Sequence, residues 1–513
     1  MQPIPLDLPP GIVSDGTPYY RRGNWVDGSR VRWKEGVVMP IGGWARFGTN
    51  LGSLDRVITD PTTEVARAAL GYTLNDGSAM FVVGTNKGLK AWYRGSTAIS
   101  DITPADFVAR PHEAEDATGY GMWFFGVDAY GTERQGDDLD RPDVFAWAFR
   151  NWGQNLLAAP KGKPSKLYEW VPTFGTPAAI VANAPTDFDC FHVTDQRIVM
   201  CAGTGAEPRL VQWSTRENNT EWAPTPENQA GSYTLPGTGR FKDIVSINGR
   251  YLLVSEADAY VCEYSGPPYI YGFEQAGEDC GTVSGLSIVA VGPRAMWLGE
   301  QSFYIFDGNA VAPLDCPVIE RVLNDVNRSQ VSKTVGFANP LWPEIWWLYQ
   351  SGEEDLDSYV YYNWQVGYWA VGKLARTCAG GGASVGGLFM LGADGYAYNH
   401  ELEGVAPIEN DMSEVFVVSA PIEIAVNASA YVHGFIGDYK KDGEVNIFIE
   451  GQDHPNGPKI PFGPYTVKYP QAGGQPTPMR ARGQLLTLRV EGKSALWSQG
   501  SIKLQIADMG ASR

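Results

Sequence analysis

Few residues in this sequence have the types and spacing that catalysis or metal binding requires. The five histidines stand at positions 112, 192, 400, 433 and 454, none of them paired at metal-ligand spacing, and neither an HExxH nor a Walker GxxxxGK[ST] pattern occurs. One GxSxG string is present at residues 382–386, but a nucleophile elbow needs a strand before its serine and a helix after it. Glycines precede Ser384 and the strand-like residues 388–391 follow it, so we predict a turn between two strands.

Acidic side chains are numerous, and two groups of them stand close together in the sequence. A glycosidase needs two carboxylates beside the scissile bond, but 58 acidic residues offer so many pairs that this requirement selects none of them. The two groups are Asp137, Asp138, Asp140 and Asp143, and Glu353, Glu354, Asp355 and Asp357. Such carboxylates could bind calcium, although neither group has EF-hand spacing. We interpret them as solvated loop acids or as acids at the lumen or rim of a channel, where they would repel the phosphates of DNA.

The overall composition favours a soluble protein without disulfides. The six cysteines are scattered between positions 190 and 378 without a CxxC pair, so we expect buried free thiols and neither a zinc site nor any other cofactor site. The net charge of −18 opposes tight non-specific binding of nucleic acid. No apolar run is long enough to span a bilayer, and the first residues lack the pattern of a signal peptide, so we expect an unexported chain.

The clearest pattern is a hairpin unit that recurs along the middle of the chain: an apolar strand, a short polar turn, and a second strand that ends in aromatic residues. Seven copies begin near Phe81, Leu156, Ile198, Leu252, Met296, Ile345 and Phe389. After a longer first interval, the starts are 42 to 54 residues apart, which is about the period of propeller blades. The sequence therefore predicts an all-β fold with a β-propeller of six to eight blades at residues 49–410, with a possible insertion near 111–143.

The segment that follows the predicted propeller has a different pattern. Apolar and polar residues alternate strictly at 486–491 and 502–506, which is typical of half-buried strands. We therefore expect residues 411–513 to form a separate C-terminal β-strand domain or to return strands that close the ring, with exposed loops in the Gly- and Pro-rich stretch 452–475. One helix is predicted near 317–326, with Pro317 at its start and Asp315 near its cap.

Residues 1–48 form an N-terminal segment that we expect to be an extended arm and that is locally basic. It contains Trp25, Trp33 and Trp44, set among the cations Arg21, Arg22, Arg30, Arg32, Lys34 and Arg46. One interpretation is that guanidinium groups stack on the indole rings and anchor the segment to the propeller. The other is that Arg21, Arg22 and the three tryptophans belong to an assembly arm that docks on a neighbouring subunit.

Several stretches of the chain resemble one known family. The strongest runs from Cys316, Pro317 and Val318 through Asn327, Gln330 and Lys333 to residues 343–349 (PEIWWLY), 359–363 (YVYYN) and Trp369. Others are residues 151–157 (NWGQNLL), 211–213 (VQW) with Trp222, Ala230 and Gly231, the early 42–44 (GGW), and the closing Arg482, Gly483, Gly510 and Arg513. Together they resemble the tail nozzle or hub proteins of short-tailed bacteriophages, a family that includes tail tubular protein B and packaged-DNA stabilisation proteins.

The resemblance implies a structural virion protein of the phage tail, made in the cytoplasm of the host bacterium, and it carries over no catalytic residue. Proteins of this family form a six-membered ring below the portal adaptor, and the genome leaves the head through the lumen of that ring. The implied partners are further copies of the chain, the portal adaptor or head-completion protein, tail fibres or spikes, and double-stranded DNA that passes without specific binding. The alternative is a propeller that degrades or binds bacterial glycans.

Overall fold

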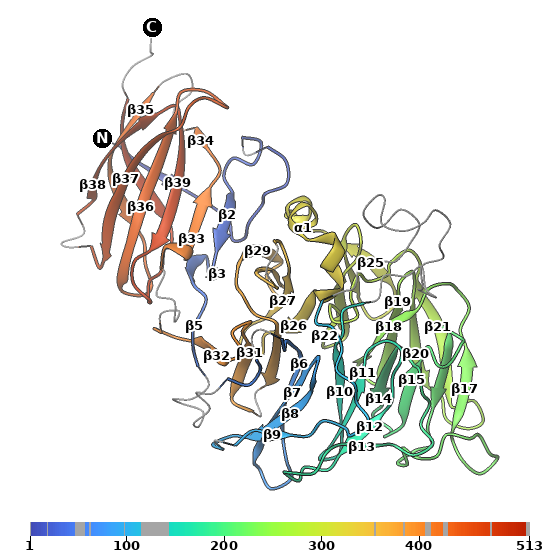
Figure 1. Cartoon of the computed structure of the whole chain (residues 1–513). Helices are drawn as coiled ribbons and strands as arrows, with labels where there is room; N and C mark the ends of the chain where they lie inside the picture. Colours follow the sequence, from blue (N-terminus) through green and yellow to red (C-terminus); the bar gives the residue numbers. More distant parts are fainter. Residues whose placement is uncertain are drawn as a thin grey trace, which may run out of the picture.

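The computed structural model describes residues 2–17, 19–46, 57–60, 63–96, 98–113, 143–352, 355–382, 385–405, 412–423, 429–471 and 475–508. Strands dominate these residues and build two domains, a β-propeller and a β-sandwich, which lie at opposite ends of the molecule in Figure 1. The predicted all-β class, with a propeller and an additional C-terminal β domain, is confirmed.

Seven four-stranded antiparallel sheets form the propeller within the described residues. Blade 1 consists of β6 (Ala66–Thr73), β7 (Ala79–Thr85), β8 (Gly88–Tyr93) and β9 (Ser100–Asp101), and blade 2 of β10 (Trp147–Trp152), β11 (Asn155–Pro160), β12 (Tyr168–Trp170) and β13 (Ala179–Ile180). Blade 3 consists of β14 (Cys190–Val193), β15 (Val199–Ala202), β16 (Leu210–Trp213) and β17 (Gly231–Thr234), and blade 4 of β18 (Phe241–Ile247), β19 (Arg250–Ser255), β20 (Ala259–Tyr264) and β21 (Tyr271–Gly277). Blade 5 consists of β22 (Val289–Val291), β23 (Arg294–Leu298), β24 (Phe303–Phe306) and β25 (Val311–Leu314). Blade 6 consists of β26 (Val335–Ala338), β27 (Glu344–Tyr349), β28 (Ser358–Asn363) and β29 (Tyr368–Lys373). Blade 7 consists of β30 (Cys378–Gly382), β31 (Gly387–Leu391), β32 (Ala397–Leu402) and β5 (Gly43–Arg46).

The first strands of successive blades line the propeller axis. They pack side by side from β6 through β30, and β30 returns to β6, so the ring is closed. Second strands are sandwiched between neighbouring blades, and every residue of β7 and β27 is accordingly buried, whereas the fourth strand β17 is mostly exposed. Each of the seven hairpins found in the sequence forms the second and third strands of one blade.

Local sequence accounts for one of the two-residue turns between neighbouring strands of a blade. β18 and β19 are joined by Asn248 and Gly249 alone, and both residues have a positive φ, of 48° and 80°. Asn and Gly tolerate this left-handed conformation, which the two-residue turn of a twisted hairpin requires. The register that follows places Ile247 opposite Arg250 and keeps the apolar side chains of both strands between blades.

The sandwich consists of two sheets. The first sheet has the strand order β1 (Gln2–Leu6), β40 (Ile502–Asp508), β35 (Ala430–Gly437) and β38 (Thr477–Gly483). The second sheet has the order β2 (Trp25–Ser29), β33 (Phe416–Ser419), β39 (Leu485–Gly492), β36 (Gly443–Gln452) and β37 (Ile460–Tyr469), and β34 (Ile422–Glu423) also pairs with β39. The alternating stretches that predicted half-buried strands lie in β39 and β40, where Val490, Leu504 and Ile506 point into the core.

Three details differ from the sequence-based expectation. The stretch 452–475 contains a ten-residue strand, β37, whose exposed residues give it a loop-like composition because it lies at the edge of its sheet. The helix α1 runs from Ile319 to Asp325, so it begins two residues later than predicted. Asp315 does not cap this helix, because the N-cap residue is Val318, which makes no side-chain hydrogen bond. The expected insertion near 111–143 lies largely outside the described residues.

The N-terminal segment does not form an independent arm. β1 and β2 are strands of the sandwich, and β5 pairs with β32 as the fourth strand of blade 7. The division of the chain at residues 48 and 410 therefore differs from the structure, in which both domains contain residues from the N-terminal segment. The ring of blades is closed by β5, and the C-terminal strands form the separate sandwich.

Candidate functional site at the junction of the two domains

The N-terminal segment, residues 2–46, joins the propeller to the sandwich. Between its sandwich strands and β5 it forms a hairpin of β3 (Val31–Lys34) and β4 (Val37–Pro40). Val38 exchanges two backbone hydrogen bonds with Gln499 of the sandwich, and the hydroxyl of Tyr361 in blade 6 donates to the carbonyl of Val31. A single apolar core runs from blade 6 through this hairpin into the sandwich.

Arg32 of β3 is the polar centre of this junction. Its side chain is 1% exposed, and it donates hydrogen bonds to two carboxylates, at 2.9 and 3.0 Å to Glu344 and at 2.5 and 2.7 Å to Glu401. Glu344 belongs to β27 of blade 6 and Glu401 to β32 of blade 7. Trp346 also donates to Glu344, and Asn339 to Glu401. Arg32 therefore ties the N-terminal hairpin to two blades at once.

The charges of this cluster are strongly coupled. Burial raises the pKa of Glu344, the charge of Arg32 opposes that shift, and the charge of Glu401 adds to it. Burial by itself lowers the pKa of Arg32, but the two carboxylates outweigh it and hold the pKa above its ordinary value. The guanidinium thus stays charged and compensates two acids that would otherwise be buried without a cation.

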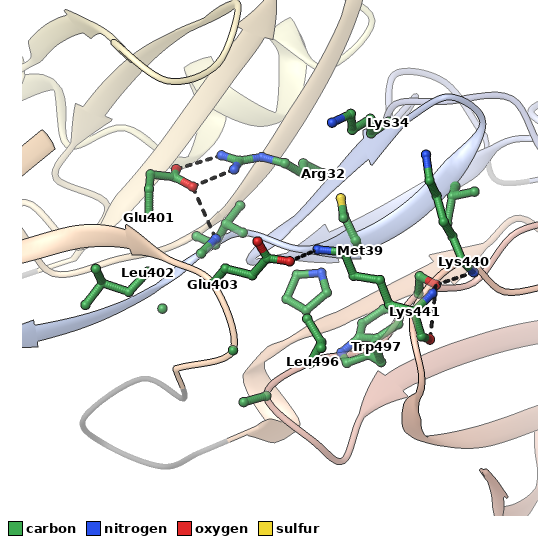
Figure 2. A pocket seen from close by; sticks show the side chains of 18 of the residues that line it. Arg32, Lys34, Met39, Glu401, Leu402, Glu403, Lys440, Lys441, Leu496 and Trp497 are labelled. Carbon is green, nitrogen blue, oxygen red and sulfur yellow. Dashed lines mark hydrogen bonds and ion pairs between the residues drawn. The ribbon is translucent and has the colours of Figure 1, made fainter. Parts of the chain in front are cut away.

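A cavity of about 220 Å³ lies beside the cluster, between the propeller, the hairpin and the sandwich (Figure 2). Its wall combines apolar residues, among them Met39, Leu402, Leu496 and Trp497, with the cations Arg32, Lys34, Lys440 and Lys441. Lys441 of the sandwich pairs with Glu403 of the propeller, and Lys440 pairs with Glu35 of the hairpin. A second cavity, of about 270 Å³, lies next to Trp25, Trp33 and the start of β40. The ion pairs around the first cavity fasten the sandwich to the other two elements.

The three tryptophans of the N-terminal segment are buried within the chain itself. Trp25, Trp33 and Trp44 are 3%, 5% and 1% exposed and belong to the apolar core that links the two domains. The guanidinium groups of Arg30 and Arg376 lie 5.2 and 5.1 Å from the centre of the Trp44 ring. This arrangement corresponds to the anchoring interpretation of the segment, and it leaves none of the three indoles on the surface for a neighbouring subunit.

Arg21 and Arg22 lie apart from these tryptophans, in the loop that precedes β2. Arg22 pairs with Glu423 of the sandwich at 2.8 Å, and the Nε of Arg21 donates to the carbonyl of Asp15. Each guanidinium also lies over a neighbouring tyrosine ring, that of Arg22 over Tyr19 at 4.8 Å. These two arginines remain accessible, so they are the part of the predicted assembly arm that another subunit could contact.

The predicted channel acids fall only partly within the described residues. Five of these acids lie outside the described residues: Asp137, Asp138, Asp140, Glu353 and Glu354. Asp355 is bound by both terminal nitrogens of Arg67, each at 2.9 Å; burial favours a higher pKa for this carboxyl, but the charge of Arg67 outweighs burial and lowers it. Asp357 accepts hydrogen bonds from the backbone and hydroxyl of Ser351. Asp143 of the first group pairs with Lys242 at 2.7 Å. None of these three described acids is therefore a free charge, although Asp355 lies near the propeller axis because Arg67 is on β6.

Polar side chains cross the propeller axis. Lys161 follows β11 in blade 2, yet its Nζ lies 2.6 Å from the carbonyl oxygen of Gly285, just before blade 5, and 2.8 Å from Asp243 in blade 4. Arg150 of blade 2 donates to His192 of blade 3 at 2.9 Å and to the carbonyl of Ile244 in blade 4 at 3.1 Å. Blade 2 is adjacent neither to blade 4 nor to blade 5, so the contacts to Ile244, Asp243 and Gly285 span part of the interior of the ring and fill it with side chains.

The remaining candidates for chemistry lie in structural positions. Residues 383 and 384 of the GxSxG string lie outside the described residues, but β30 and β31 on either side of them pair as a hairpin, with Gly382 opposite Gly387. Two histidines, 192 and 400, are buried, and burial together with an adjacent arginine lowers the pKa of each well below its ordinary value. All six cysteines are free and buried, as expected, and burial raises the pKa of the Cys378 thiol to about 12.

The described part of the chain contains no group of three or more His, Cys, Asp or Glu residues arranged to hold a metal ion. Within the same residues, no helix has both the length and the apolar character needed to cross a bilayer.

Comparison with known proteins gives little guidance. No family model and no curated protein matches the sequence. Among solved structures, an exported protein of Bacteroides fragilis aligns with a TM-score of 0.27 and 13% identity, over 54% of this chain and 78% of its own. A chain of the mitotic checkpoint complex aligns with a TM-score of 0.38 and 7% identity, over 70% of this chain and 97% of its own. Similarities at these scores do not bear on function.

Sequence reasoning missed the central cluster. The sequence shows Arg32 only as one of six cations near the tryptophans of the N-terminal segment, and Glu344 only as one residue of the apolar stretch PEIWWLY. A lone acid in a strand that is otherwise apolar is a usable signal, because a buried carboxylate needs a cation. The identity of that cation, more than 300 residues earlier in the chain, follows only from the tertiary structure.

Proposed function

We propose that this chain is a structural subunit of the tail of a short-tailed bacteriophage. In this proposal six copies form a ring below the portal adaptor, and the ring retains the genome and later conducts it during ejection. The other partners are the tail fibres or spikes, and the mature protein resides in the virion tail. The chain carries out no chemical reaction of its own.

The observation that carries the proposal is the interlocked N-terminal segment. One stretch of chain supplies two strands to the sandwich and the closing strand of blade 7 to the propeller, and Arg32 ties it to blades 6 and 7. Pulling the domains apart would require breaking the buried ion cluster of Arg32, the backbone hydrogen bonds between Val38 and Gln499, and the apolar core that both domains share. Such a body suits a ring wall that must keep its shape while DNA passes.

The obstructed propeller axis adds support. Lys161 and Arg150 cross the inside of the ring of blades, so DNA has no path through a single propeller. A conduit built from this chain must therefore form between several copies. The negative charge of the chain then becomes an advantage, because acids on the wall of such a conduit repel the phosphates of DNA.

The stretch with the strongest family resemblance has a defined place in the fold. Residues 343–349 contain β27, residues 359–363 lie in β28, and Trp369 lies in β29, so the stretch builds most of blade 6. The carbonyl of Trp369 accepts a hydrogen bond from the backbone of Ile12, and Tyr361 contacts β3. The resemblance is therefore concentrated in the blade on which the N-terminal segment rests.

The test is to measure the assembly state of the full-length chain. Mass photometry of the purified protein, followed by cryo-microscopy, is expected to show a ring with a mass near six times the chain mass of 56.0 kDa. Assembly on purified portal and adaptor proteins should be measured in parallel, because a nozzle can depend on that template. A chain that stays monomeric in both experiments, or a ring whose axis is filled by protein, would refute the proposal.

A further inference from the structure

Charge is divided unevenly between the segments of this chain. Residues 49–410 contain 24 basic and 44 acidic residues, a net charge of −20, and they include six of the seven blades in full. Residues 1–48 have a net charge of +2, and residues 411–513 have as many basic as acidic residues. Two copies would repel each other if their propellers met, whereas the sandwich of one copy can approach the propeller of another without this penalty.

One face of the sandwich carries unpaired cations. On the sheet β1-β40-β35-β38, the side chains that point away from the core include Arg480 and Arg482 of β38 and Lys503 of β40, and all three are exposed. Tyr431 lies directly opposite Arg482 and contacts the ring of His433 at 4.3 Å. None of the three cations forms an ion pair with a described residue. We call this surface the basic face.

A matching group of acids lies on the propeller. The group consists of five exposed side chains: Glu263 of β20, Glu274 of β21, Glu278 and Asp279 of the following connection, and Glu300 of the turn after β23. They follow the outer edge of blade 4 and the adjoining turn of blade 5, and none forms an ion pair with the part of the chain that is described. Tyr269, which is 80% exposed, lies in the loop between β20 and β21. We call these five acids the acidic seam.

We propose that the basic face of one copy binds the acidic seam of the next copy, an inference that rests on the proposed function. In Figure 1 the sandwich strands β35 and β38 and the blade 4 strands β20 and β21 lie at opposite ends of the molecule. Two different, complementary surfaces so placed give a head-to-tail contact, which is the kind that builds rings when the rotation closes. Arginine and tyrosine, which both surfaces together supply, are favoured residues at the centres of interfaces.

A second copy explains the paired features better than nucleic acid does. Duplex DNA on the basic face would account for Arg480, Arg482 and Lys503, but it would leave the acidic seam without a role. It would also bring a polyanion against a chain with a net charge of −18. Contact between copies neutralises both surfaces and leaves the other acids of the propeller free to face a conduit.

The test uses charge reversal in the full-length chain. One variant carries Arg480→Glu and Arg482→Glu, a second carries Glu263→Lys and Glu274→Lys, and a third combines all four changes. Lys459→Glu combined with Lys468→Glu is the matched control, because it also reverses two charges and both side chains, 57% and 77% exposed, lie at β37 of the other sheet. Thermal melting checks that each variant folds, and mass photometry over a concentration series at low and high salt measures assembly.

Each double reversal is expected to raise the concentration needed for assembly at least about tenfold, since like charges then meet across the contact. The variant with all four substitutions is expected to assemble again, because its basic face has become acidic and its acidic seam basic. The control is expected to assemble like the unmodified chain. High salt should weaken assembly of the unmodified chain.

Three results would overturn the inference, and they are distinguishable. If the unmodified chain never forms a ring, alone or on its portal template, the proposed function fails and this contact fails with it. If rings form but both double reversals assemble normally, or if the combination restores nothing, only the contact fails. If the unmodified chain binds duplex DNA in an anisotropy assay and Arg480→Glu with Arg482→Glu abolishes that binding without changing assembly, the basic face belongs to nucleic acid.

Discussion

Replacing Arg32 with methionine should reveal how much the buried cluster contributes to the junction. Methionine keeps an apolar stem beside Trp342, whose ring centre lies 4.2 Å from the guanidinium carbon, but it removes the only cation that contacts Glu344 in the described structure. The side chains of Glu344 and Glu401 are 1% and 6% exposed, so solvent compensates little for the loss of their cation. Removing one member of a buried ion pair costs about 3 to 5 kcal/mol, and we expect a loss of this size at pH 8.

The loss should depend on pH with a defined sign. Burial already raises the pKa of Glu344, and without the opposing charge of Arg32 that pKa would rise further above the value in the unfolded chain. The folded variant would then bind more protons than the unfolded chain in the mildly acidic range, so its stability falls as the pH rises. The difference from the unmodified chain should therefore be smaller at pH 5 than at pH 8.

Urea denaturation followed by tryptophan fluorescence, at pH 5 and pH 8, measures both effects. Arg216→Met removes an exposed arginine that forms no ion pair with a described residue and is the matched control, with an expected change within about 0.5 kcal/mol. Arg32→Lys keeps the charge but cannot bind two carboxylates with a planar fork, so an intermediate loss is expected. A loss below about 1 kcal/mol for Arg32→Met at pH 8, or an equal loss at both pH values, would refute this account of the junction.

Three further predictions concern the propeller. Trp44→Ala should cost about 3 to 5 kcal/mol and expose β5 to proteases, because the ring that it removes is 1% exposed and stacks on His400; an unchanged cleavage rate would contradict this. Asp189→Asn should stabilise the chain by at most about 3 kcal/mol at pH 8 and have little effect at pH 4, measured by thermal melting. The reason is that burial raises the pKa of Asp189 from 3.8 to about 6, so the unmodified chain loses stability as the pH rises through this range. His400→Gln should flatten the loss of stability that the unmodified chain shows as the pH falls below about 6.5, because the unfolded chain takes up a proton that buried His400, beside Arg376, does not. An unchanged slope of melting temperature against pH would show that His400 is not responsible.

The sequence by itself determined the repeating part of this protein. Each blade repeats the same local pattern, an apolar strand, a polar turn and an aromatic strand, and strand alternation and turn chemistry act over a few residues, so the seven hairpins and the strands β39 and β40 could be located without coordinates. The burial of Cys201 and Cys262 follows in the same way, because they lie in the apolar hairpin strands β15 and β20.

Only the tertiary structure decided how the ends of the chain are used. The segment 43–46 is too short for its sequence to show that it pairs with β32, some 350 residues later, because the pairing energy comes from a partner strand that local sequence does not contain. The same holds for Arg32 with Glu344 and Glu401, and for Lys161 with the carbonyl of Gly285: in each case the charge is satisfied by groups that the closed ring brings together. Local periodicity encodes the blades, whereas the junction and the obstructed axis depend on contacts that exist only once the ring has closed.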